Sequence, residues 1–205
     1  MRSLVRLSLA AALAALAACG PGSGAAVDPS AEAPSSASAV SDFSVYDLEA
    51  PWRDPTGVER ALGSLGGKVR VVAMVYTHCT HTCPMVVAEM KRLEAALGAG
   101  ERGGVGFVLV SLDPERDTPA RLAESAASMR LDPARWTLLA GDAGAVRELA
   151  ALLGVRYRAE ADGQISHSNA YFVLDAAGRV VHRQEGLGAG TDAALARVRE
   201  AVARR

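Results

Sequence analysis

The sequence predicts an α/β fold in which one central mixed sheet is flanked by helices. Two observations support this prediction. Apolar runs typical of buried strands alternate along the chain with segments whose apolar residues recur at helical spacing. Near the C-terminal end, two strand-like runs follow each other across a short turn, which indicates an antiparallel hairpin. Because helices separate the earlier strands, those strands are expected to be parallel, and the sheet mixes both directions.

Each strand is predicted from a short run of apolar residues. Residues 69–76 and 105–112 are almost continuously apolar, as expected of strands buried on both faces. Residues 136–140 form a shorter candidate. Residues 170–175 and 179–184 flank an Ala-Ala-Gly turn and form the predicted hairpin.

Helices are predicted over 84–98, 118–129, 142–153 and 191–203. Apolar side chains fall on one face of the first and of the last. End signals support three of them. They are N-cap residues before the second and third helices and glycines after the first and third: Thr118, Asp142, Gly98 and Gly154. The resulting order, β-α-β-α-β-α-β-β-α, is that of a thioredoxin-like sheet, although the pattern alone leaves a flavodoxin-like fold open.

The N-terminal segment has the features of an export signal. Arg2 and Arg6 precede an apolar run over 7–18, which is too short to span a membrane as a helix. The run ends in Leu-Ala-Ala-Cys19-Gly, which resembles the lipobox of bacterial lipoproteins. We therefore expect residues 1–19 to be a signal peptide ending at a lipidated Cys19. The alternative is an ordinary signal peptide with an incidental cysteine.

The next segment, residues 20–41, is rich in Gly, Pro, Ser and Ala and is expected to be a flexible tether. It would leave residues 42–205 as one globular domain. The protein is then extracytoplasmic and anchored by lipid to a bacterial membrane, in an oxidising compartment.

Overall composition excludes two classes of function. Hydrophobic residues make up 50% of the chain and charged residues 22%, so the chain is not a disordered protein. The formal net charge is −1, which argues against nucleic-acid binding, because such binding needs a basic excess.

A Cys-x-x-x-Cys pair stands where the first buried strand meets the first helix. Pro84 suits the first helical position, so Cys83 is expected near the N-cap, where the helix dipole favours a thiolate. Cys79 precedes it in the loop. Three interpretations remain open from these residues: a structural disulfide, a redox-active disulfide and a site for a soft metal ion.

A two-thiolate metal site needs a third ligand, and the four histidines are the candidates. His167 lies in a polar turn before the strand at 170–175, and in a thioredoxin-like sheet that turn lies beside the cysteine loop. His78 and His81 flank and interrupt the cysteine pair. His182 lies in the hairpin and is expected to be a surface residue.

Four ordered segments resemble the Sco/SenC family of copper-binding proteins, and together they cover roughly residues 42–190. The matching residues are Tyr76-Thr77-His78-Cys79-x-x-x-Cys83-Pro84; Ser111-Leu112-Asp113-Pro114-Glu115-Arg116-Asp117-Thr118-Pro119; Trp136 with Gly141 and Leu153-Gly154-Val155; and His167-Ser168-x-x-Tyr171-Phe172-x-x-Asp175-x-x-Gly178. The loop between the cysteines departs from the family, where it often carries a proline and an acidic residue. Here it is Thr80-His81-Thr82, and His81 is either a further donor or a solvated loop residue.

The resemblance implies a thioredoxin-like, membrane-tethered metallochaperone that delivers copper to the CuA centre during cytochrome c oxidase assembly. It implies that Cys79, Cys83 and His167 bind Cu(I) or Cu(II), and that Asp113 lies beside the ligands. The expected partners are cytochrome c oxidase subunit II or another copper enzyme, and an upstream copper donor.

Three other functions stay open. The first is an extracytoplasmic thiol–disulfide reductase that uses a Cys79–Cys83 disulfide and has no metal role. The second is a peroxidase or redox sensor. The third is a binding lipoprotein whose cysteine pair is structural.

Overall fold

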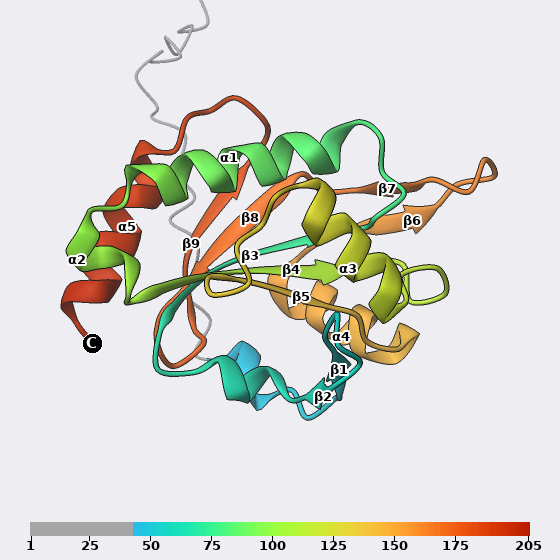
Figure 1. The fold of residues 1–205 in the computed structure, drawn as a ribbon, viewed down its shortest axis with the longest axis horizontal. Helices are drawn as coiled ribbons and strands as arrows, with labels where there is room; N and C mark the ends of the chain where they lie inside the picture. Colours follow the sequence, from blue (N-terminus) through green and yellow to red (C-terminus); the bar gives the residue numbers. More distant parts are fainter. Residues whose placement is uncertain (1–42) are drawn as a thin grey trace, which may run out of the picture. The chain divides into compact units, whose positions relative to one another are not determined.

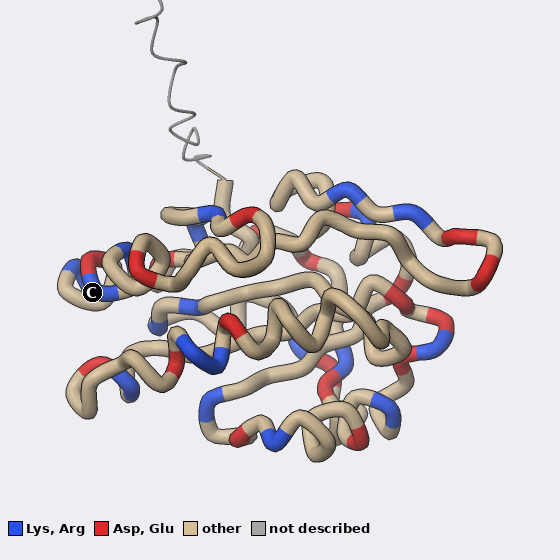
Figure 2. Tube along the Cα trace, turned by 90° about the horizontal axis from the view of Figure 1, so that it is seen from above, with Lys and Arg blue, Asp and Glu red and all other residues tan. Residues whose placement is uncertain are grey.

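The computed structural model describes residues 43–205, and the predicted signal peptide, lipidation site and tether lie outside the described residues. Within 43–205, no helix combines the length and apolar character needed to cross a membrane. Basic and acidic residues are interspersed along the described part of the chain (Figure 2).

A five-stranded mixed sheet forms the centre of the structure, as predicted (Figure 1). Its strand order is β5-β4-β3-β8-β9. The pairs β3–β4 and β4–β5 are parallel, whereas β3–β8 and β8–β9 are antiparallel. The antiparallel half excludes the flavodoxin-like alternative, which needs parallel neighbours throughout. The strands are β3 (Val69–Val75), β4 (Val105–Ser111), β5 (Trp136–Leu139), β8 (Ala170–Leu174) and β9 (Val180–Glu185).

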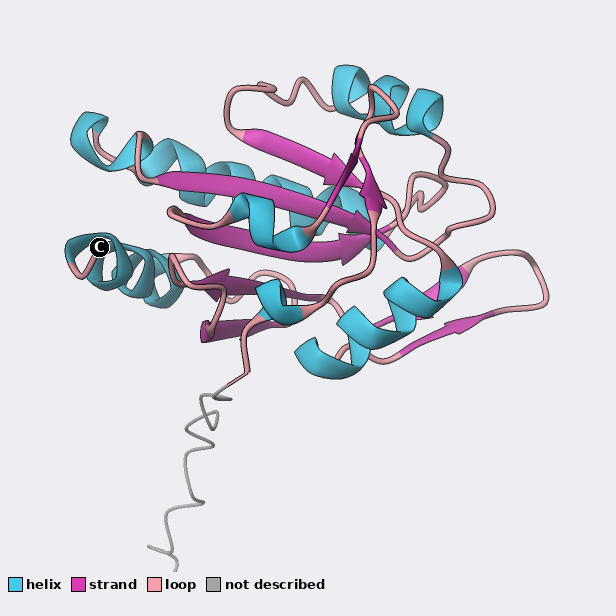
Figure 3. Ribbon diagram, turned by 90° about the horizontal axis from the view of Figure 1, so that it is seen from below, coloured by secondary structure: helices cyan, strands magenta, loops and turns pink. Residues whose placement is uncertain are grey.

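Helices cover both faces of this sheet. Helices α1, α3 and α5 lie on one face and α4 lies on the other (Figures 1 and 3). All residues of β4 are buried, as expected of a strand covered on both sides. The helices are α1 (Thr82–Ala96), α2 (Ala99–Arg102), α3 (Pro119–Ser128), α4 (Ala143–Leu153) and α5 (Asp192–Ala203).

The first helix differs from its prediction at both ends. It begins at Thr82 with His81 as the N-cap residue, so Cys83 lies inside the first turn rather than at the cap. It ends at Ala96 because Leu97 is extended. Gly98 is the N-cap of the short α2, whose Glu101 carboxylate accepts the Gly98 N–H at 2.6 Å.

Several short elements carry too few residues for a periodicity to show in the sequence. They are two 3₁₀ helices, η1 (Val45–Asp47) and η2 (Leu62–Leu65), and two small hairpins made of β1 (Trp52–Arg53) with β2 (Glu59–Arg60) and β6 (Tyr157–Ala159) with β7 (Ile165–His167). The second hairpin matters for function, because His167 ends its second strand.

Candidate metal centre

The two cysteines lie together at the start of α1. Cys79 is half-buried in the loop after β3, whereas Cys83 is buried in the first turn of the helix. The Cys83 N–H donates to Cys79 Sγ at 3.3 Å, and Thr82 Oγ1 lies 3.7 Å from the same sulfur. Both cysteines are free thiols in the structure. The Cys83 N–H, in the first helical turn, thus faces the Cys79 sulfur.

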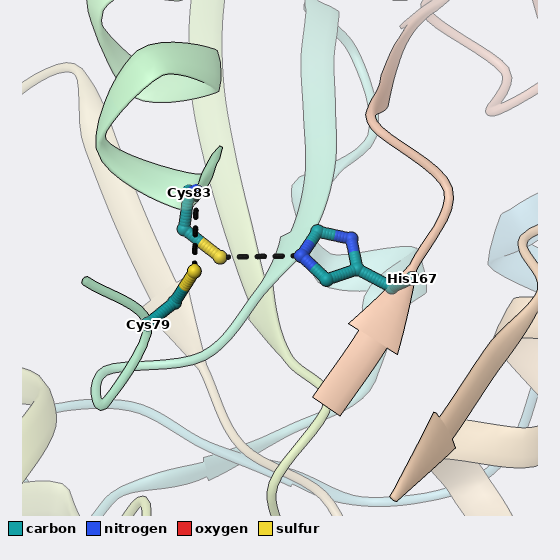
Figure 4. A group of neighbouring side chains, drawn as sticks. All are labelled: Cys79, Cys83 and His167. Carbon is teal, nitrogen blue, oxygen red and sulfur yellow. Dashed lines mark hydrogen bonds between the residues drawn. The ribbon is translucent and has the colours of Figure 1, made fainter. Parts of the chain in front are cut away.

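His167 reaches the cysteine pair from the end of β7 (Figure 4). Its Nε2 lies 3.3 Å from Cys83 Sγ, and its Nδ1 lies 3.0 Å from the Ser168 carbonyl oxygen. A carbonyl can only accept, so Nδ1 donates its proton and Nε2 keeps a lone pair toward the sulfur. One ligand atom from each of Cys79, Cys83 and His167 lies within 4.8 Å of the others. The structure therefore brings together the three residues that the sequence predicted as ligands.

Tyr76 contacts the imidazole of His167. Its ring meets the His167 ring edge-on, with centroids 5.9 Å apart. Its hydroxyl donates to Gln164 Oε1 at 3.0 Å and accepts the Ile165 N–H at 3.2 Å. Tyr76 thus links the end of β3 to β7, the strand that carries His167.

The two thiols differ in pKa. Burial raises the pKa of Cys79, but hydrogen bonds from Cys83, His81 and Thr82 outweigh it and bring the value to about 7. Burial raises the pKa of Cys83 far above its usual range, and the neighbouring Cys79 adds to this effect. Burial also lowers the pKa of His167, opposed by its bond to the Ser168 carbonyl. Near neutral pH the metal-free centre therefore holds a partly ionised Cys79, a protonated Cys83 and a neutral imidazole.

Asp117 anchors the start of the cysteine loop. Its fully buried carboxylate accepts the Thr77 N–H at 3.1 Å, the Thr77 hydroxyl at 2.5 Å and the Ser111 hydroxyl at 2.6 Å. His78 Nδ1 lies 3.8 Å away. The sequence showed Asp117 within a matched segment, but nothing there distinguished it as the residue that holds the loop.

Asp113 was predicted to lie beside the ligands. Its buried carboxylate accepts from Arg116 Nε at 2.5 Å, and it lies within 4.8 Å of His78 and Asp117. Asp113 therefore belongs to a group next to the cysteine loop, and its influence on the metal centre stays a prediction.

The other two histidines lie apart from the three-residue group. His81 is exposed, and its Nδ1 lies 2.9 Å from Thr80 Oγ1. His182 is partly exposed in β9, with its Nε2 3.3 Å from Gln184 Oε1. The geometry gives neither of them a place among the ligand atoms of Cys79, Cys83 and His167.

Two sulfurs and one imidazole nitrogen form a donor set for a soft or borderline metal ion. Thiolates select Cu(I) and Zn²⁺, and imidazole also suits Cu(II). The proton on His167 Nδ1 is held by a backbone carbonyl, an arrangement common for metal-binding histidines. The chemistry of the donors therefore fits a three-coordinate site for such an ion, built on a thioredoxin-like α/β domain.

Comparison with known proteins agrees with a metal-binding protein of thioredoxin-like fold. The SCO1/SenC family model matches residues 50–203, and the chain belongs to that family. It is 28% identical over 146 residues to the SCO1 protein homolog of Bacillus subtilis (strain 168). This match covers 69% of this chain and 75% of that protein.

Two solved structures are similar over most of their length. One is BsSco, described as a member of the Sco family of cytochrome c oxidase assembly proteins, with a TM-score of 0.68 at 25% identity over 81% of this chain and 97% of that one. The other is Bradyrhizobium japonicum ScoI with copper bound, with a TM-score of 0.59 at 25% identity over 74% of this chain and 96% of that one. The predicted thioredoxin-like fold and Sco/SenC membership are confirmed.

Proposed function

We propose that this protein binds one copper ion through Cys79, Cys83 and His167 and delivers it to the CuA centre during cytochrome c oxidase assembly. The observation that carries the proposal is the convergence of two sulfurs and one imidazole nitrogen within 4.8 Å. The copper-bound ScoI structure and the oxidase-assembly description of BsSco support the choice of metal and of process.

The centre has features suited to a metal in transit. Three protein donors leave a coordination position open, so an acceptor ligand can bind copper before the donors release it. Cys79 is the more accessible thiol, and it is partly ionised near neutral pH. Copper can therefore enter and leave on the Cys79 side, while Cys83 and His167 keep it within the fold.

The membrane attachment is part of the same proposal. The lipobox-like segment ending at Cys19 would anchor the chain outside the cytoplasm, and residues 20–41 would let the domain reach a membrane-bound acceptor. Expression with and without Cys19→Ser, followed by membrane fractionation and mass spectrometry of the N-terminus, tests it. An acylated Cys19 in the membrane fraction supports the anchor, and an unmodified, secreted chain contradicts it.

Delivery is tested by transfer to a real acceptor. Copper-loaded Cys19→Ser protein is mixed with the reduced, metal-free CuA domain of an oxidase subunit II, and the absorption of the assembled centre is followed. The proposal predicts assembly that is lost with Cys79→Ser and kept with His182→Ala. No transfer to a domain that does take up free copper would contradict it.

A second function is favoured by the difference between the two thiols. In a thiol–disulfide reductase, the Cys79 thiolate attacks a partner disulfide and displaces one partner thiolate, which takes up a proton. Cys83 then loses its proton and attacks Cys79 Sγ, which forms the Cys79–Cys83 disulfide and releases the second partner thiol. Reduction of the metal-free CuA domain tests it, because this activity needs both cysteines and does not need His167.

A further inference from the structure

A buried carboxylate interrupts the apolar face of α1. Glu89 is 2% exposed and lies on the same face as Val86, Met90 and Leu93. Taking an ionised carboxylate out of water is costly unless partners compensate for the lost hydration. The partners of Glu89 therefore indicate what its burial is for.

The main partner is a backbone amide of a distant loop. Glu89 Oε1 accepts the Gly188 N–H at 2.5 Å, and Arg92 Nη2 approaches the same oxygen at 3.4 Å from the surface. Among the described residues, Oε2 has no hydrogen-bond partner and neither has the buried hydroxyl of Tyr171. Burial first, and then the charge of Glu89, raise the pKa of Tyr171 to about 12. The Tyr171 side chain is therefore neutral beside Glu89.

The loop that Glu89 holds has a backbone built on glycines. Gly186, Gly188 and Gly190 have φ angles of 75°, 82° and 82°, a region that residues with a side chain rarely adopt. The loop joins β9 to α5 and lies over α1 (Figure 1). The loop has no helix or strand of its own, and the Gly188 N–H bond to Glu89 is one of the contacts that hold it against α1.

The same loop is bonded to the segment that carries His167. The Gly186 N–H donates to the Asn169 carbonyl at 2.9 Å, and Asn169 follows His167 by two residues. A continuous path thus runs from Cys83 along α1 to Glu89, across to Gly188 and Gly186, and back through Asn169 to His167. The two halves of the candidate metal centre are joined by this path at a point away from the metal.

We propose that Glu89 is a positioning residue that ties α1 to the glycine loop 186–190 and so sets the place of His167 relative to Cys83. The inference rests on the proposed copper function for its importance. The structural tie itself can be tested without metal.

Loss of the Glu89–Gly188 hydrogen bond should change the affinities for Cu(I) and Cu(II) to different extents. Cu(I) is held mainly by the two thiolates, whereas Cu(II) depends more on the imidazole. Glu89→Met fills about the same space without an oxygen to accept the Gly188 N–H. We expect it to weaken Cu(II) binding by about 10- to 100-fold, as for other residues that orient a ligand. Cu(I) binding should change by less than about threefold, because both thiolates remain.

Three variants, all made in the Cys19→Ser full chain, separate the effect of the Gly188 hydrogen bond from the effect of the Glu89 charge. Glu89→Met removes both. Glu89→Gln removes the charge but keeps an oxygen for the Gly188 N–H. Arg92→Ala removes the surface ion pair and leaves the Gly188 bond intact. The Arg92 side chain is 60% exposed, so Glu89→Met leaves no unpaired charge buried and is expected to fold.

The metal-free readouts are amide hydrogen exchange at Gly188 and Gly186 and the NMR resonances of the His167 ring. Glu89→Met should speed exchange at both glycines and shift the ring resonances, while Glu89→Gln and Arg92→Ala should match the parent protein. Unchanged exchange and ring resonances in Glu89→Met would overturn the proposal, and so would Glu89→Gln behaving like Glu89→Met. If the parent binds no copper, the copper function fails, while the exchange data still decide whether the tie exists.

Discussion

Cys79 and Cys83 belong to one short motif, but the fold gives them different surroundings. Cys83 is 4% exposed in the first turn of α1, whereas Cys79 is half-buried and its sulfur accepts the Cys83 N–H. These surroundings move the pKa of Cys79 down to about 7 and the pKa of Cys83 up. The thiolate is the nucleophile and the metal ligand, so the two residues should differ in reactivity.

We predict that iodoacetamide modifies Cys79 at least about tenfold faster than Cys83 at pH 7 in the metal-free Cys19→Ser protein. Peptide mass spectrometry after timed quenching measures both rates. The unfolded protein is the control, in which the two rates should become similar. Equal rates in the folded protein, or faster modification of Cys83, would contradict the assigned difference.

The same pKa values predict how Cu(I) affinity depends on pH. A metal-bound thiolate has lost its proton, so binding releases one proton from Cys83 throughout the neutral range. Cys79 releases a second proton only below its pKa of about 7, and His167, whose pKa is lowered, is already neutral. Affinity should thus rise about 100-fold per pH unit well below pH 7 and about 10-fold per unit above it.

Competition with a Cu(I) chelator, repeated across the neutral range, measures this change of slope. The control is His182→Ala, in which the break near pH 7 should remain, because His182 lies outside the group of Cys79, Cys83 and His167. A single slope across the whole range in the parent protein would show that Cys79 does not titrate near neutrality.

At the scale of elements, the sequence predicted best where local chemistry decides the structure. Asp142 caps α4 by accepting the Ala145 N–H at 2.8 Å, and Gly154 ends it with a φ of 65°. Thr118 caps α3, with Pro119 as its first residue. These signals act within a few residues, so they are readable without tertiary contacts.

The sequence predicted least where pairing across the fold decides the structure. Strands β6 and β7 have three residues each and are defined by pairing with each other, with Tyr157 opposite His167. A polar turn was the only local signal for that segment. The sequence therefore placed His167 in the right region, but it could not show the strand that holds the ring or the contact with Tyr76.

We predict that Asp142→Ala destabilises the protein by about 1 kcal/mol, because the first turn of α4 loses its side-chain acceptor. Urea denaturation measures the change. The matched control is Thr191→Ala, since Thr191 is the N-cap residue of α5 but makes no side-chain cap bond. If both variants lost equal stability, the effect would not come from the Asp142 cap. Copper binding should be unchanged in both.

In the molecule as a whole, the central sheet positions the candidate metal centre. Strand β3 leads directly into the cysteine loop, and its neighbours β4 and β8 are buried along their whole length. The Phe107 and Trp136 rings stack across β4 and β5, with centroids 4.8 Å apart. The apolar runs of these strands were sufficient to predict the sheet, because burial on both faces leaves a continuous hydrophobic signal.

We predict that Leu109→Ala, in the middle of β4, lowers the free energy of unfolding by about 2–5 kcal/mol. Leu109 is only 2% exposed, so the shorter side chain leaves a cavity in the core. Val58→Ala is the control, since Val58 is 55% exposed, and its change should stay within about 0.5 kcal/mol. Urea denaturation of both variants tests this. Similar losses would mean that β4 does not form the core as described.

The most direct test of the copper centre is copper binding by the reduced Cys19→Ser chain, measured by metal analysis and competition with a Cu(I) chelator. We predict one copper per chain, lost with Cys79→Ser or Cys83→Ser and weakened with His167→Ala, above all for Cu(II). His81→Ala and His182→Ala should bind like the parent. Absence of competitive binding, or binding that does not depend on the cysteines, would contradict the assignment of this site as a copper centre.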